Sequence, residues 1–479
     1  MSNRPSGNPR PDPAYVRHCA EEARARTGAT AIESVLGKGR GRDLLRYCYT
    51  ATYPPLGAMK ERKSRKPLRP HPGGWTRVYF HYPFCSGRCS FCHFNVSLTH
   101  KTRSAAYVRC LERELEMLAG SGQYRTRDIY FGGGTPSLMS AADIGGLINR
   151  VRGLLEVDPS CTITLEMHPD TVNRKYLGEL RGRGINRISI GVQDFDNAVL
   201  SGTIRRHSRT QAVSAIAEIR RLRFDFNIDL LAPLPGQTDA SWVGTLATAF
   251  SLDPDSVTVY TTSVRDTMPV RRKLASSLDL RSETRSLHMH AIAQIVAGHH
   301  GYEETTSRCF TRKSGRRATQ VARECTADAV TPELGIGCGA YGLFGGHVYH
   351  NVPHVQEYLR RIEKGESPVL RARRISSVEL AHRAAVLALR AGAIELDTLR
   401  WLAGTAGFGR FERRFEKLER AGLAIRQGQT LSLTDPGKLL SDELSTWFVS
   451  PSVRGALGHP ARTRSNRFLE HLNHFYDLT

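Results

Sequence analysis

Three cysteines lie within eight residues of each other, in the stretch HYPFCSGRCSFCHFN. Cys85, Cys89 and Cys92 form a C-x3-C-x2-C set directly after an apolar run typical of a strand. Thiolates are soft ligands that suit zinc or an iron–sulfur cluster. Zinc normally takes a fourth Cys or His, and His93 adjoins Cys92 so closely that only strain would bring it into that role.

Three thiolates on a [4Fe–4S] cluster leave one iron open. An open iron is what a cofactor that chelates through amino and carboxylate groups requires. The spacing therefore favours a cluster over structural zinc or free thiols. The other seven cysteines share no spacing and indicate no disulfide framework, so a reducing compartment would keep them as thiols. They are Cys19, Cys48, Cys110, Cys161, Cys309, Cys325 and Cys338.

Short apolar strands alternate with amphipathic helices from Thr76 onward. The strands are VYFHYPF, DIYFGGG, TITLEMHP, NRISIGVQ, FNIDLLAPLPGQT and SVTVYTTS, and helices are predicted over Arg103–Ala119, Ala141–Leu155 and Thr210–Leu222. This alternation predicts an α/β fold in which βαβ units form a parallel sheet, curled into a partial or full barrel. Reactive groups in such barrels lie at the C-terminal ends of the strands, and the three cysteines fall there.

Four regions are expected along the chain. Residues 1–72 form a polar N-terminal extension with one helix around Ala14–Arg26, and 73–310 form the barrel core. Residues 311–375 extend the core, and 376–479 form a C-terminal winged-helix-like domain and tail. In that last region the pattern predicts three helices and a β-hairpin, with no strand between the helices.

The chain of 479 residues is strongly basic, with 68 Lys and Arg against 46 Asp and Glu and a formal charge of +22. The one dense basic run, Lys60–Arg69, is predicted to be a solvated linker, with an anion-binding patch as the alternative. The sequence contains no run of about 18 apolar residues, so no membrane span is predicted. The N-terminus has no apolar segment of a secretory signal, so the chain is expected to be cytoplasmic.

Seven ordered segments carry a family resemblance. They are HYPFC, GGGTPS, LEMHPDTV, GINRISIGVQDF, RRHS, DLLAPLPGQT and ELGIGCGAYG. Together they resemble the radical S-adenosylmethionine (SAM) superfamily, and within it the oxygen-independent coproporphyrinogen III oxidase (HemN-like) family, over roughly residues 75–450. The resemblance implies a [4Fe–4S] cluster on the three cysteines and two SAM molecules. It also implies a C-terminal helical domain that covers the active site.

The resemblance also implies roles for single residues. Glu166 and Gln193 would bind the amino acid and ribose of SAM, Arg205 its carboxylate, and Asp229 the ribose or adenine side. Thr135 would fix the amino group. The other expected cofactor contacts are Gly132, Gly133, Gly134, Gly337 and Ala340, the last two beside the second SAM. Tyr79 and His93 are the candidate catalytic residues.

Two departures narrow the expected function. Coproporphyrinogen oxidases of this family carry another cysteine where this chain has Phe94, and the haem chaperones carry an HNxxYW stretch that is missing before the glycine-rich segment. The chain is therefore most similar to the class C methylases and cyclopropanating enzymes. Porphyrinogen decarboxylation, a haem chaperone and a nucleic-acid-modifying or -binding protein are the alternatives.

The expected partners follow from the same resemblance. They are a small-molecule substrate and reduced flavodoxin or ferredoxin as electron donor. Nucleic acid is not expected, because basic and aromatic residues do not interleave as they do on RNA-binding platforms. A monomer is expected.

Overall fold

The computed structural model describes residues 11–27, 52–68, 73–92, 94–98, 100–120, 122–262, 283–306, 308–312 and 329–457. Within these ranges the barrel strands belong to one 14-stranded mixed sheet, and three more strands near the C-terminus form a separate sheet. No helix among the described residues is long and apolar enough to cross a bilayer.

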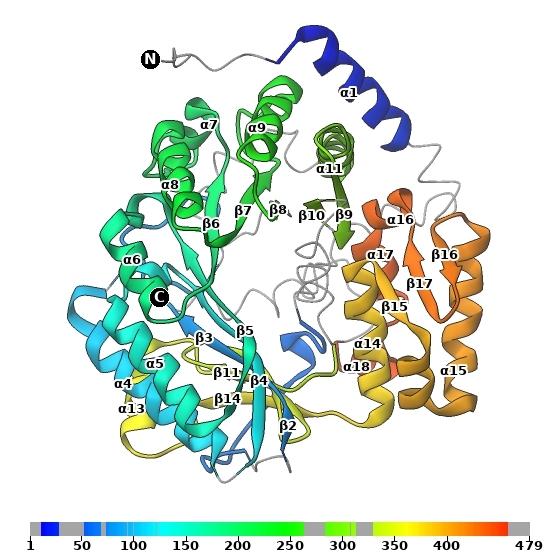
Figure 1. Ribbon diagram of the computed structural model, residues 1–479. Helices are drawn as coiled ribbons and strands as arrows, with labels where there is room; N and C mark the ends of the chain where they lie inside the picture. The colour runs from blue at the N-terminus through cyan, green and yellow to red at the C-terminus, as the bar shows by residue number, and fades with distance from the viewer. Residues whose placement is uncertain are drawn as a thin grey trace.

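The centre of the large sheet is a run of parallel strands in chain order, which bends into the open arc of a partial barrel (Figure 1). The strands are β3 (Arg77–Tyr82), β4 (Tyr124–Gly133), β5 (Glu156–Met167), β6 (Arg187–Gln193), β7 (Asp225–Ala232) and β8 (Ser256–Thr261). The α/β prediction and its partial barrel are confirmed. Because the strands are parallel, their C-terminal ends meet at one edge of the sheet.

Helices connect these strands and cover the outside of the arc (Figure 1). They are α4 (His100–Ala119), α5 (Ala141–Leu154), α6 (Arg174–Gly182), α7 (Asn197–Gly202), α8 (Arg209–Arg221), α9 (Asp239–Ser251) and α11 (Glu283–His299). Polar N-caps start several of them: the side chains of Ser140, Ser208 and Thr238 each accept a hydrogen bond from a backbone N–H of the first turn. The predicted N-terminal helix is α1 (Pro13–Thr27), which packs against α11.

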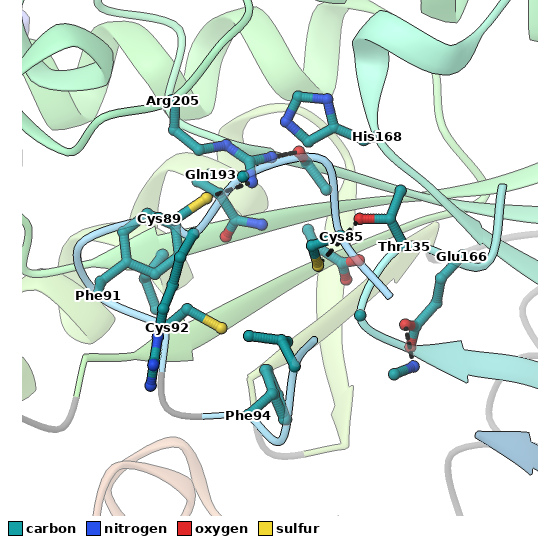
Figure 2. A pocket seen from close by; sticks show the side chains of 18 of the residues that line it. Cys85, Cys89, Phe91, Cys92, Phe94, Thr135, Glu166, His168, Gln193 and Arg205 are labelled. Carbon is teal, nitrogen blue, oxygen red and sulfur yellow. Dashed lines mark hydrogen bonds between the residues drawn. The ribbon is translucent and has the colours of Figure 1, made fainter. Parts of the chain in front are cut away.

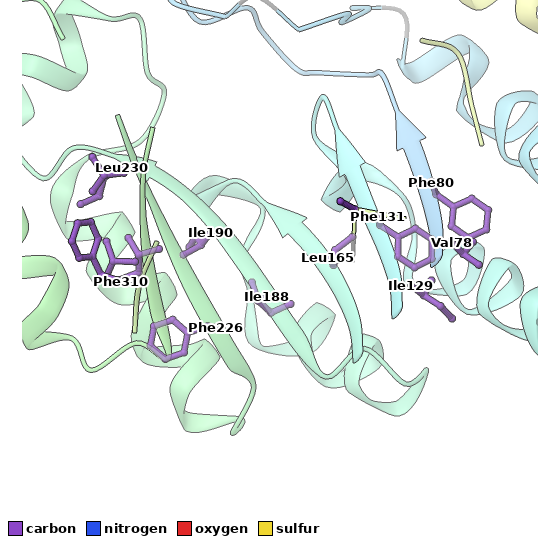
Figure 3. Packing of buried hydrophobic residues seen from close by; sticks show 14 of the residues in the cluster. Val78, Phe80, Ile129, Phe131, Leu165, Ile188, Ile190, Phe226, Leu230 and Phe310 are labelled. Atoms are coloured by element: carbon purple, nitrogen blue, oxygen red, sulfur yellow. The ribbon is translucent and has the colours of Figure 1, made fainter. Parts of the chain in front are cut away.

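The core lies between the strands and their helices. Alternate strand side chains point to the helices and are fully buried, for example Phe80 of β3 and Phe131 of β4, whose stacked rings are 5.0 Å apart (Figure 3). Each such side chain contributes about 1.5–3 kcal/mol to folding by leaving water. The opposite side chains of the same strands face the inside of the arc and are free to form a site.

Several strands were not predicted. On the β3 side the sheet continues through β11 (Glu333–Ile336), β12 (Tyr341–Phe344), β13 (His347–Asn351), β14 (Val369–Arg374) and β1 (Lys60–Glu61), and on the β8 side through β10 (Cys309–Arg312) and β9 (Tyr302–Thr306). Of these added strands, β11 runs parallel to its barrel neighbour β3. The others, β12, β13, β14, β1, β10 and β9, run antiparallel to the strands they pair with. The linker prediction is wrong where the basic run begins, because Lys60 and Glu61 pair with β14. Arg69 lies outside the described residues.

The C-terminal elements form a compact unit of helices around a small sheet. Helix α14 (Ser377–Ala391) is followed by β15 (Ala393–Glu395), α15 (Leu396–Arg420), β16 (Ala424–Gln427) and β17 (Thr430–Leu433), and then by α16 (Asp435–Leu439), α17 (Ser441–Thr446) and α18 (Pro451–Leu457). The predicted hairpin is present as β16 and β17. The prediction of no strand between the helices is wrong, because β15 pairs with β17.

Close packing of β11 against β12 depends on Gly335. A Cβ at this position would lie 1.7 Å from the carbonyl oxygen of Tyr341. Gly335→Ala is therefore expected to lower the free energy of unfolding by about 3 kcal/mol through forced backbone shifts. Gly298→Ala in α11 is the control, since nothing lies within 4 Å of its Cβ and alanine stabilises a helix by about 0.5–1 kcal/mol over glycine. Thermal unfolding of both variants checks this; equal midpoints would contradict it.

Candidate active site

A cavity of about 410 Å³ lies where the barrel strands end. The loop that follows β3 carries all three cysteines on its wall (Figure 2). The cavity also collects most of the predicted site residues from six other segments of the chain. These are Tyr79, Gly133, Gly134, Thr135, Glu166, Gln193, Arg205 and Asp229.

Two donors reach the thiols from other elements (Figure 2). The Thr135 hydroxyl donates to Sγ of Cys85 at 3.3 Å, and Nη1 of Arg205 donates to Sγ of Cys89 at 3.4 Å. Burial raises the pKa of the Cys85 thiol to about 11, with the Thr135 hydrogen bond opposing the rise. Metals bind the thiolate, so binding of iron releases these protons, and the two donors stabilise sulfur that carries negative charge.

The arrangement of the thiols fits an iron–sulfur cluster better than a zinc ion. Among the described residues, no three His, Cys, Asp or Glu side chains converge on a single metal ion. A structural zinc needs four such ligands at about 2.0–2.3 Å, which the described residues of the cysteine loop do not supply. A [4Fe–4S] cluster needs one thiolate on each of several irons, and a cysteine set spread around a cavity fits that need.

Two carboxyl groups face the cavity from β5 and β7, the strands on either side of β6. Glu166 of β5 accepts hydrogen bonds from Tyr130 (2.9 Å) and from the backbone N–H of Gly133 (3.0 Å). Its pKa is raised to about 7, first by burial and then by the charge of Asp229 on β7. Burial likewise raises the pKa of Asp229 to about 6. Burial destabilises both carboxylates, and the charge of Asp229 adds to the effect at Glu166, so the cavity favours a cationic ligand.

Arg205 and Gln193 lie where the segments after β6 return to the cysteine loop. Besides its contact with Cys89, the Arg205 guanidinium donates to the carbonyl of Gly191, while its Nε is buried without a partner. Gln193 ends β6 with φ of +72°, a left-handed conformation that side chains rarely adopt. Strain of this kind concentrates at functional sites. The structure thus brings both predicted residues to the cavity.

Gly134, which directly follows β4, is required by the cysteine loop itself. A Cβ on Gly134 would lie 2.7 Å from the carbonyl oxygen of Pro83 and 2.8 Å from that of Phe84. The backbone N–H of Thr135 donates to the same Phe84 carbonyl at 2.9 Å. Glycine therefore lets the 132–135 segment pass against the start of the cysteine loop. Tyr79 lies on the wall of the cavity, with its hydroxyl 3.2 Å from Nδ1 of His81.

Four predicted residues are not placed on this cavity. Gly132, near the end of β4, is not among the residues that line it. His93 lies outside the described residues. Gly337 and Ala340, in the turn after β11, do not line the cavity in the part of the chain that the structure describes. A buried carboxyl group holds their turn: Glu114 of α4 accepts hydrogen bonds from Gly337 N (2.8 Å), Asn351 (2.7 Å) and Tyr358 (2.6 Å). Burial raises the pKa of Glu114 to about 7.

Sequence reasoning did not assign the apolar wall of the cavity or the histidine beside it. Phe91, Phe94 and Tyr260 line the cavity, and Phe94 and Tyr260 are exposed. Phe94 stood out only as a departure from a family pattern. His168, which bonds to Asp170, also lines the cavity. His168 immediately follows β5, and this position at the C-terminal end of a strand could have identified it as a site residue from the sequence.

Comparison with known proteins agrees with this geometry. Residues 79–249 match the family model of the Radical SAM superfamily. The chain contains a radical SAM domain. A heme chaperone HemW of Bacillus subtilis is 27% identical over 379 residues, which are 78% of this chain and 98% of the relative. An oxygen-independent coproporphyrinogen III oxidase of Synechocystis is 25% identical over 393 residues, 78% of this chain and 84% of the relative.

A solved structure supports the fold over most of the chain. Coproporphyrinogen III oxidase (HemN) from Escherichia coli superposes with a TM-score of 0.71 at 23% identity, covering 84% of this chain and 97% of that one. The chain thus shares the fold of this structure, and its match to the Radical SAM superfamily implies a [4Fe–4S] cluster and SAM as cofactors. The second SAM molecule stays a prediction.

Proposed function

We propose that this protein is a radical SAM enzyme that transfers a SAM-derived methyl or methylene carbon to an apolar, unsaturated small molecule. Cys85, Cys89 and Cys92 hold the cluster. When bound, the cluster and SAM supply a carbon radical after one-electron cleavage of SAM. The observation that carries the proposal is one cavity that combines three thiols, two destabilised carboxylates and an apolar wall.

The carboxylate pair supports binding of SAM. SAM carries a sulfonium and an ammonium group. A cation beside Glu166 and Asp229 offsets the burial that raises both pKa values, and it also offsets the charge of Asp229 that adds to the rise at Glu166. Under the proposal, Glu166 and Gln193 bind the amino acid and ribose, and Asp229 the ribose or adenine side. Thr135 fixes the amino group, and Arg205 pairs with the carboxylate, for which its planar fork is suited.

The apolar wall supports the class of substrate. Phe94 is 55% exposed, beside Phe91 and Tyr260 on the same cavity. Exposed aromatic side chains at a cavity favour an apolar ligand that covers them. A substrate packed against this wall keeps water from the reacting atoms. Tyr79 is the candidate catalytic residue within reach of the cavity.

A second function is favoured by the relatives. Proteins named as a heme chaperone and as a coproporphyrinogen III oxidase align with 78% of this chain. A role in haem metabolism, either decarboxylation or haem transfer, is therefore the second candidate. Phe94 in place of the cysteine of the oxidases and the missing HNxxYW stretch of the chaperones are the features that weigh against it.

One experiment separates these functions. The protein is reconstituted anaerobically with iron and sulfide and mixed with SAM, dithionite and a panel of apolar, unsaturated acceptor molecules, and its small-molecule products are identified by mass spectrometry. 5′-Deoxyadenosine together with S-adenosylhomocysteine is expected, because methyl or methylene transfer consumes two SAM molecules. 5′-Deoxyadenosine alone would contradict carbon transfer and favour decarboxylation. Neither product, together with tight haem binding, would instead identify a chaperone.

A further inference from the structure

The glycine-rich turn after β11, residues 337–340, packs against the start of the cysteine loop. Gly337 has φ of +109°, and a Cβ there would lie 2.5 Å from the carbonyl oxygen of His81 and 2.8 Å from Oη of Tyr107. His81 lies near the end of β3, four residues before Cys85. Only glycine allows the backbone of the turn to come this close to the strand that leads into the loop.

The same turn contacts the other end of the loop. Gly339 has φ of +72°, and a Cβ there would lie 2.8 Å from Nδ2 of Asn95, which follows Cys92 by three residues. Asn95 donates to the carbonyl of Pro353 at 2.6 Å, and the N–H of Gly339 donates to the carbonyl of Val352 at 2.9 Å. Both ends of the cysteine loop therefore meet one turn from a distant part of the chain.

We propose that Tyr107 of α4 is a positioning residue for SAM cleavage, because it fixes the cysteine loop to this turn. Its hydroxyl donates to the His81 carbonyl at 2.9 Å and accepts from the backbone N–H of Cys338 at 2.8 Å. Tyr107 does not line the cavity formed by the described residues, so it acts through the backbone that it holds. The inference deepens the proposed function and rests on its cluster and SAM, but not on carbon transfer.

The bridge made by Tyr107 is buried and supported from behind. Burial raises the pKa of its hydroxyl well above the usual range, so the hydroxyl keeps the proton that it donates to His81. Seven residues further along the same face of α4, Glu114 accepts from the N–H of Gly337 at 2.8 Å. Asn351 donates both to Glu114, at 2.7 Å, and to the carbonyl of Gly337, at 3.0 Å. The turn cannot shift without breaking one of these bonds.

The position of the loop matters because its thiols work together with groups from other strands. The base of the loop is closed by the N–H of Cys85, which donates to the carbonyl of Ser97 at 2.9 Å, so the cysteines move when the two ends move. Glu166, in contrast, is fixed on β5. Losing an outer partner of metal ligands costs about 10–100-fold in metal affinity or activity, and a misplacement of about 1 Å can cost about 100-fold in rate.

The test compares Tyr107→Phe with Tyr302→Phe. Each substitution removes one hydroxyl from a buried tyrosine; Oη of Tyr302 donates to the carbonyl of Pro254 at 2.8 Å, before β8 and away from the loop. Both variants should fold and melt at similar temperatures. Tyr107→Phe alone should weaken SAM binding to the cluster-loaded protein about tenfold or more and change the electron paramagnetic resonance spectrum of the reduced cluster. Anaerobic equilibrium dialysis with SAM measures the affinity, at matched iron and sulfide content.

A milder variant keeps the test decisive if Tyr107→Phe does not fold. Tyr358→Phe removes one of the donors to Glu114, at 2.6 Å, and should weaken SAM binding in the same direction by a smaller factor. An unchanged SAM affinity and spectrum in Tyr358→Phe would then overturn the positioning role.

The remaining outcomes separate this inference from the proposed function. SAM affinity and a spectrum in Tyr107→Phe that match those of Tyr302→Phe would overturn the positioning role, as would equal losses in both variants, which would indicate a general effect on stability. A wild-type protein that takes up no cluster would overturn the proposed function and, with it, the role of Tyr107. Formation of 5′-deoxyadenosine without S-adenosylhomocysteine would contradict carbon transfer alone, and weaker SAM binding in Tyr107→Phe would still support the positioning role.

Discussion

Cys89→Ser is expected to abolish SAM cleavage while leaving the chain folded. The serine hydroxyl is a hard, weakly acidic ligand that holds iron poorly compared with a thiolate. With only Cys85 and Cys92 left, the protein should retain less than about one of the four irons of a [4Fe–4S] cluster. Cys89 is partly exposed on a loop, so the substitution removes little packing. Iron and sulfide content, electron paramagnetic resonance and product analysis measure the loss.

The control is a substitution of a cysteine that lies away from the cavity. Cys110→Ala on α4 removes a buried thiol that does not line the cavity, and it should keep both the cluster and SAM cleavage at a modest cost in stability. Equal iron content in Cys89→Ser and wild type would contradict the cluster assignment. Loss of iron in Cys110→Ala as well would show that reconstitution depends on folding rather than on the three-cysteine loop.

The parallel strands could be predicted because short apolar segments alternate along the chain with segments that have the apolar spacing of a helix. The cysteine loop could be predicted because ligand spacing is local. Strands β11 to β14 were missed, since each has four to six residues and their pairing joins segments far apart in the chain. A strand such as HVYHN is also rich in polar residues, which periodicity alone does not assign to a sheet.

Partners far apart in the chain also explain what was missed around the site. Glu114 occupies the middle of a charged helix and looks like a surface residue in the sequence. Its three hydrogen-bond partners, however, come from more than 200 positions later. A carboxyl group with such partners can be found only once the fold is known. The residues of the cavity, by contrast, follow strands in order, so an ordered resemblance could name them.

Asp442→Asn is expected to loosen the C-terminal elements from the barrel. Asp442 of α17 is buried and accepts hydrogen bonds from Arg308 (2.6 Å), between β9 and β10, and from Arg390 (2.9 Å) on α14. The amide cannot balance both guanidinium charges. Breaking a buried ion pair by removing one partner costs about 3–5 kcal/mol. The free energy of unfolding at pH 7 should fall by that amount. Asp397→Asn, an exposed partner of Arg400, should cost about 0–1 kcal/mol.

The pH dependence of the Asp442→Asn effect gives a second check. Burial alone would raise the pKa of Asp442, but Arg308 and Arg390 outweigh it and lower the pKa from 3.8 to about 2. A carboxylate with a depressed pKa stabilises the fold fully above its unfolded pKa, and that stability is lost as the pH falls toward the folded value. The difference between wild type and Asp442→Asn should therefore be constant above about pH 5 and shrink between about pH 4 and 2. A difference that instead grew on acidification would mean that Asp442 is not ionised in the folded protein.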